Sequence, residues 1–130
     1  NYNWQKGVEE LDDKSTSPSR HAAPAFGATK LRYQSKKMTL ELSSQYSAAM
    51  PFEKMPQEEI GKPAIYATDT NGNPYSPSWL IVNFATRIPI TPSIQINAGI
   101  ENIGDLQYRG YSSGIVSPGR NFQVSVKGTF

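Results

Sequence analysis

The side chains that usually carry catalytic or metal-binding chemistry are scarce in this sequence. It has no cysteine and a single histidine, His21, which lies in the loop-like stretch SPSRHAAP. Thiolate chemistry and disulfides are therefore excluded, and a lone loop histidine is more often solvated than bound to a metal. No acid and base are paired in a way that would support proton transfer. We expect a protein that is not an enzyme and that has no cofactor and no resident metal ion.

Two acidic stretches could in principle bind a cation. In DTNGN, Asp69, Asn71 and Asn73 are spaced like the start of a calcium loop, but Gly72 comes too early and no glutamate stands at the twelfth place. Asn-Gly is instead a strong turn signal. The run EELDDK is read as a solvated acidic segment rather than a cation site.

Tyrosines and arginines in loop-like stretches are the candidates for ligand binding. A tyrosine at a loop tip offers a rigid surface for contact, although it can equally pack to hold a loop together. Both interpretations stay open for each of them. The candidate substrate-binding residues are Tyr66, Tyr75, Tyr108, Arg109, Tyr111 and Arg120.

The composition indicates which elements must position these residues. The chain has 130 residues, of which 37% are apolar, with 10 glycines and 10 prolines. Abundant turn formers and aromatics are typical of the all-β class. The net charge of +2 is too small to indicate a nucleic-acid partner.

Five segments alternate apolar and polar residues with the period of a β-strand. One face is apolar, as at Leu40, Val82, Phe84 and Val124, and the other is polar. A further strand end is expected at Tyr2 and Trp4. The segments are 28–35, 38–50, 78–88, 93–102 and 121–130, and the polar face includes Glu41, Gln45, Asn83, Arg87, Gln95, Glu101 and Lys127.

The lengths of these segments and of their connections favour a transmembrane β-barrel. Most segments approach the ~9–11 residues that a tilted strand needs to cross a bilayer, and no stretch of ~18 apolar residues predicts a membrane helix. Short connections at 34–38 and 89–93 alternate with long ones at 7–24, 51–78 and 104–119. We expect the short turns at the periplasmic end.

The last thirty or so residues, GIENIGDLQYRGYSSGIVSPGRNFQVSVKGTF, resemble the C-terminal end of TonB-dependent outer-membrane receptors. Gly104 departs from the family pattern, which often has Leu or Phe at that place. The features that match are Asn102, Asp105, Tyr108, Pro118, Gly119, Arg120 and Phe130.

The resemblance implies that residues 1–130 are the C-terminal segment of a longer receptor, the last ~5–6 antiparallel strands of a barrel of about 22. The plug domain and the TonB box would precede it. Such receptors lie in the outer membrane of Gram-negative bacteria and take up ferric siderophores, haem or cobalamin. Their partners are the TonB–ExbB–ExbD complex, outer-membrane lipids and lipopolysaccharide, and the barrel-assembly machinery, for which Phe130 would be the signal. Whether a surface lipoprotein also takes part stays open.

Two alternatives to this function remain. A passive porin or an adhesin would have similar strands, and a TonB box upstream would distinguish a receptor from either. A soluble β-sandwich that binds carbohydrate through its loop tyrosines is the other alternative. It predicts that the chain folds alone and stays in solution without detergent.

Overall fold

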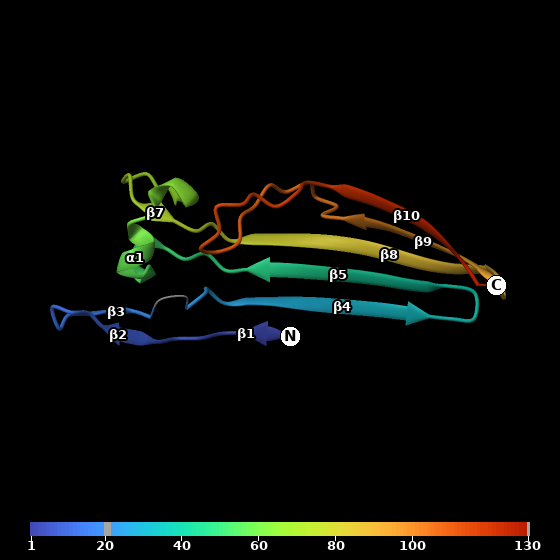
Figure 1. The fold of residues 1–130 in the computed structure, drawn as a ribbon, viewed down its shortest axis with the longest axis horizontal. Helices are drawn as coiled ribbons and strands as arrows, with labels where there is room; N and C mark the ends of the chain where they lie inside the picture. The colour runs from blue at the N-terminus through green and yellow to red at the C-terminus, as the bar shows by residue number, and fades with distance from the viewer. Residues whose placement is uncertain (20–21, 130) are drawn as a thin grey trace. The chain divides into compact units, whose positions relative to one another are not determined.

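The computed structural model describes residues 1–19 and 22–129 and is dominated by one antiparallel sheet. The predicted all-β class is confirmed, whereas the predictions for His21 and Phe130 lie outside the described residues. Along the sheet the strand order is β1-β4-β5-β8-β9-β10 (Figure 1). These strands are β1 (Tyr2–Asn3), β4 (Phe26–Gln34), β5 (Thr39–Ser47), β8 (Trp79–Thr91), β9 (Ile94–Glu101) and β10 (Asn121–Gly128).

The register of β8, β9 and β10 places the alternating residues on two distinct faces. Phe84 is opposite Ile100, which is opposite Phe122, and these side chains share one face. On the other face Arg87 is opposite Asn97, which is opposite Ser125. The separation into an apolar and a polar face is therefore as the sequence predicted.

The strand ends differ from the predictions at several places. β8 continues through Pro89 to Thr91, beyond the predicted end, and a register shift falls between those two residues. Pro89 is still in register with Gln95, and the residue left without a partner is Ile90, so the bulge follows directly after the proline. β5 ends at Ser47 rather than near residue 50, and β1 is two residues long, so Trp4 lies outside it.

The long connections contain short elements that alternation does not reveal. Two small sheets pair β2 (Val8–Glu10) with β3 (Thr16–Pro18) and β6 (Ala67–Thr68) with β7 (Pro74–Tyr75). The helical turns are η1 (Phe52–Lys54), α1 (Gln57–Ile60) and η2 (Pro63–Ile65). Within the described residues no helix has the length and apolar character needed to cross a membrane.

The chain divides into two compact units. The loop unit comprises residues 1–27, 46–79 and 108–117, and the sheet unit comprises 28–45, 80–107 and the residues from 118 onward. Among the residues that the structure describes, few apolar side chains are buried: Met50 and Met55 in the loop unit and Ile81 in the sheet unit. The apolar face of the sheet unit is open, with Val124 77% exposed.

Candidate functional site

A broad hollow with a volume of about 980 Å³ is lined mainly by residues of the polar face of the sheet unit, and Phe122 and Val124 also contribute to its lining. Of the residues that sequence analysis placed on the polar face, Glu41, Arg87, Gln95 and Lys127 line this hollow. Three others do not line it. Asn83 Oδ1 accepts a hydrogen bond from the backbone N–H of Asn102 at 2.8 Å, Glu101 accepts one from the Asn121 side chain at 3.2 Å, and Gln45 lies elsewhere on β5.

Charges on the polar face are unevenly neutralised. Glu41 forms ion pairs with Lys30 at 2.9 Å and with Arg32 at 2.7 Å, so its single carboxylate serves two cations of β4. Arg87 and Lys127 line the same hollow, and no ion pair joins either of them to a carboxylate in the described part of the chain. The hollow is therefore a polar surface with excess positive charge.

In the loop unit, a buried carboxylate connects two stretches that are far apart in sequence. Glu59 of α1 is completely buried. Its Oε1 accepts hydrogen bonds from Lys62 Nζ at 2.8 Å and from Ser112 Oγ at 3.1 Å, and its Oε2 accepts one from the Tyr66 hydroxyl. Burial alone raises the pKa of Glu59, but the hydrogen bonds from Lys62, Tyr66 and Ser112 outweigh it and leave the pKa lowered.

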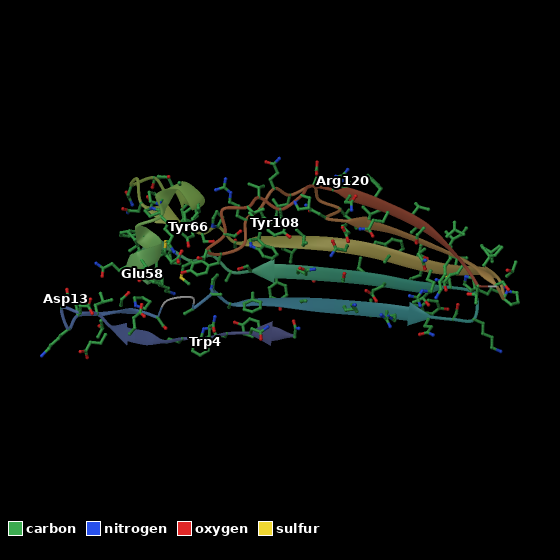
Figure 2. The ribbon with its side chains drawn as sticks, viewed as in Figure 1. Trp4, Asp13, Glu58, Tyr66, Tyr108 and Arg120 are labelled. Carbon is green, nitrogen blue, oxygen red and sulfur yellow. The ribbon has the colours of Figure 1, made fainter. Side chains whose placement is uncertain are left out.

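Two of the tyrosines predicted to bind a ligand lie together beside this carboxylate. The ring centroids of Tyr66 and Tyr111 are 6.1 Å apart (Figure 2 labels Tyr66). Burial raises the pKa of both phenols, and the Glu59 carboxylate raises them further, that of Tyr111 to about 12. Among the described buried polar atoms, the Tyr111 hydroxyl is one that lacks a hydrogen-bond partner. The cluster of Glu59, Lys62, Tyr66, Tyr111 and Ser112 is called the Glu59 cluster below.

The remaining loop candidates also contact other parts of the loop unit. The ring of Tyr108 packs on Trp79, with centroids 4.3 Å apart and planes inclined by 33°. Arg109 Nη1 donates to the carbonyl of Ala64 at 3.3 Å. Tyr75, predicted in a loop, belongs to the two-residue strand β7. These contacts correspond to the packing interpretation that the sequence left open.

Sequence reasoning did not identify Glu59. Its neighbours in the sequence include Glu58 and Lys62, and a short acidic stretch of this kind is usually exposed. A lysine three residues later was a weak signal, because that spacing suits a pair on a helix. The contact with Ser112 joins residues far apart in sequence and had no local signal.

Four of the residues that carry the family resemblance, Asn102, Asp105, Pro118 and Arg120, take part in hydrogen bonds between the end of β9 and the start of β10. Asn102 is nearly buried and exchanges hydrogen bonds with the backbone of Leu106, at 2.8 and 3.1 Å. Its Nδ2 also donates to the carbonyl of Pro118 at 3.4 Å. Asn102 and Asp105 have positive φ values of 49° and 54°, which Asn and Asp tolerate better than most residues.

Asp105 and Arg120 complete this set of bonds. Asp105 Oδ1 accepts the backbone N–H of Arg120 at 2.7 Å, and Arg120 Nε donates to the carbonyl of Ile103 at 2.9 Å. Figure 2 shows Arg120 at the start of β10. A Cβ at Gly119 would lie 2.6 Å from Asp105 Oδ1, so close approach to this carboxylate requires glycine there. Gly119 differs in this respect from Gly72, which among the described glycines is the one with a positive φ, of 86°.

Comparison with known proteins identifies a structural relative. The chain is similar to the solved structure of a protein described as copper transporter OprC, with a TM-score of 0.67 and 17% sequence identity. The likeness covers 92% of this chain and 18% of that chain. No protein-family profile and no curated protein matches the sequence. The likeness shows the fold, and the place of this chain within a longer receptor stays a prediction.

Proposed function

We propose that the chain forms part of the wall of an outer-membrane transport receptor, which takes a scarce, large nutrient into the periplasm with energy supplied through TonB. The observation that carries the proposal is the two-faced sheet. Phe122, Val124 and Val126 are 68%, 77% and 68% exposed on its apolar face, while the opposite face is a polar hollow. Burying so much apolar surface is favourable only against another apolar phase, and the hydrocarbon of a bilayer is such a phase.

Two further observations support transport. The fold is similar to that of a protein described as a copper transporter. Asn102, Asp105 and Arg120, which carry the resemblance to the end of TonB-dependent receptors, all form hydrogen bonds in this region. The proposed partners are the TonB–ExbB–ExbD complex, acting through a plug domain, and the barrel-assembly machinery.

The membrane part of the proposal is tested by labelling the full-length protein in the outer membrane. Spin labels are placed singly at Leu42 and Val124 on the apolar face and at Gln45 and Ser125 on the polar face. We expect the first pair to be accessible to oxygen dissolved in lipid and the second pair to a water-soluble relaxation agent. The same accessibility at both pairs would contradict the membrane wall.

The transport part is tested separately by uptake in cells. Deletion of the gene should abolish uptake of one of ferric siderophore, haem, cobalamin or copper, each supplied in labelled form. Deletion of TonB should have the same effect on that ligand. Uptake that continues without TonB would favour a passive porin instead.

A further inference from the structure

Arg87 and Lys127 lie on the same face of the sheet, on the strands that flank β9. Arg87 of β8 is opposite Asn97, and Lys127 of β10 is opposite Gln95. Adjacent strands are about 4.8 Å apart, so β8 and β10 are separated by roughly 10 Å. Asn97 and Gln95 are two residues apart along β9, which adds an offset of roughly 7 Å, so the backbones of Arg87 and Lys127 are roughly 12 Å apart. Both side chains are long, and a cation on each can therefore approach one small anion that lies above β9.

Neutral hydrogen-bonding groups fill the space between the two cations. Gln95 Nε2 donates to Asn97 Oδ1 at 2.6 Å, and Asn97 Nδ2 donates to Ser125 Oγ at 3.2 Å. Ser125 accepts this bond, so its hydroxyl hydrogen can be donated elsewhere. A row of oriented side chains thus runs along β9 from Gln95 to Asn97, crosses to Ser125 of β10 and ends in a hydroxyl donor.

The carboxylates on this face are already bonded to other groups. Glu41 pairs with Lys30 and Arg32, and Glu101 accepts from Asn121. Glu101 is also four residues from Asn97 along β9, which corresponds to roughly 13 Å in an extended strand. Glu41 lines the same hollow as Arg87 and Lys127, but its carboxylate is shared by Lys30 and Arg32, and within the described residues no carboxylate pairs with Arg87 or Lys127.

From this arrangement we infer that Arg87 and Lys127 form a recognition site for an oxyanion, a carboxylate or phosphate group, on the polar face of the sheet. The planar guanidinium of Arg87 can bind two oxygens of such a group, and the Lys127 ammonium adds a point charge. The oxyanion would come either from a free ligand or from an acidic segment of the same receptor. The inference rests on the proposed function, because it takes the hollow to be part of a lumen.

The experiment uses the full-length receptor, purified in detergent at low salt, with the double variant Arg87→Gln/Lys127→Gln. Citrate and inorganic phosphate are titrated calorimetrically to detect a free oxyanion. In the same samples, the midpoint of unfolding shows whether an acidic segment of the receptor itself is bound at Arg87 and Lys127. Removing two cations without a bound partner should leave the midpoint unchanged or raise it, because like charges repel. A lower midpoint therefore indicates that an oxyanion was held.

Matched variants separate this effect from a general loss of charge. Lys36→Gln/Lys37→Gln, in the exposed turn between β4 and β5, removes the same charge and should change neither readout. Arg87→Lys keeps the charge but lacks the bidentate guanidinium, and should weaken binding less than the double variant does. If the double variant fails to fold, Arg87→Lys and Lys127→Gln are measured singly.

Either of two results supports the inference. The double variant weakens citrate or phosphate binding at least tenfold, or its midpoint falls while that of the turn variant does not. Equal binding and an unchanged or higher midpoint would overturn it. Uptake in cells is scored separately, so a receptor that transports normally without this site would keep the proposed function and lose only the oxyanion site.

Discussion

The loop unit and the sheet unit use their polar side chains in opposite ways. In the loop unit, Glu59 is completely buried and bonded to Lys62, Tyr66 and Ser112. In the sheet unit, Arg87 and Lys127 project into an open hollow, and no ion pair is described for either. Tyr66, Tyr108 and Tyr111, which sequence analysis marked as candidates for ligand binding, pack on other rings of the loop unit. Arg87 and Lys127, which it placed on the wall, line the hollow.

The difference follows from the number of apolar groups that each region can bury. The loop unit has short elements and little apolar core, so hydrogen bonds to a buried acid stabilise it. The sheet unit is stabilised by strand pairing and, in the proposed membrane setting, by lipid on its apolar face. Some of its polar side chains, such as Asn102 and Glu41, still bond to neighbouring strands and turns, whereas Arg87 and Lys127 form no ion pair within the described residues.

Phe84→Arg should have the largest effect and tests whether the apolar face of the sheet unit meets lipid. Arginine on a lipid-facing position near the middle of the membrane costs about 2–4 kcal/mol. The measurement is the unfolding free energy of the full-length protein in bilayers. The matched control is Ala85→Arg, the next residue along β8 and on the polar face, which should cost much less. Equal losses of unfolding free energy in the two variants would contradict the assignment of lipid to one face only.

Glu59→Ala should have the next largest effect and is confined to the loop unit. It leaves the Lys62 ammonium and the Tyr66 and Ser112 hydroxyls without their acceptor, at a cost of about 1–3 kcal/mol. Hydrogen exchange of the loop amides should accelerate, while exchange in β8 to β10 should not change. Glu53→Ala, at an exposed position of η1, serves as the control. Unchanged exchange around residues 57–66 would refute the structural role of Glu59.

Tyr108→Leu should have a smaller effect. It keeps most of the apolar volume but removes the ring that packs on Trp79, and such aromatic pairs contribute about 0.5–1.5 kcal/mol beyond the buried area. The indole fluorescence of Trp79 should shift as well. If Tyr108 instead binds the transported ligand, uptake would fall far more than stability.

The change in stability of the loop unit with pH should be the smallest of these effects near neutral pH. The pKa of Glu59 is lowered, so its contribution to stability is present above its ordinary value of 4.5 and is lost as the pH falls through the lowered value. The pKa values of Tyr66 and Tyr111 are raised, so their contribution is complete below 10.0 and is lost as the pH rises beyond it.

Spectroscopic titration of the full-length protein checks this prediction. Two phenols should ionise well above the others, and Tyr111→Phe should remove the one with a pKa of about 12. Protection of the loop amides, that is, their exchange relative to the intrinsic rate at the same pH, should fall below pH 4.5 in the native protein but not further in Glu59→Ala. Identical acid behaviour of the two proteins would exclude Glu59 as the responsible group.

Most strands of the sheet unit could be predicted, because alternation depends only on residues that are neighbours in the sequence. The alternation in 121–128 assigns Val124 and Ser125 to opposite faces whatever lies beside them, since successive side chains of a strand point to opposite sides. The end of β8 was predicted less accurately than this alternation. Pro89 is a turn former by type, and only the pairing with β9 and the bulge keep it in the strand.

The loop unit could be predicted only as loops. The tendency of Asn71-Gly72 to turn is local, and Gly72 has the positive φ that such a turn uses. The burial of Glu59 depends on Ser112, fifty-three residues further along the chain, and no local pattern encodes that contact. The same applies to Tyr111, whose surroundings are set by Tyr66 and Glu59.

The sequence by itself determined the strand pattern, its two faces and the turn chemistry, because each depends on residues close together in the chain. Only the tertiary structure decided which polar groups neutralise one another. It gave Glu41 two cations, gave Glu59 its three donors, and placed Arg87 and Lys127 across β9 without a carboxylate between them. Electrostatic partners are chosen by distance in space, and distance between remote residues is set only when the strands have paired.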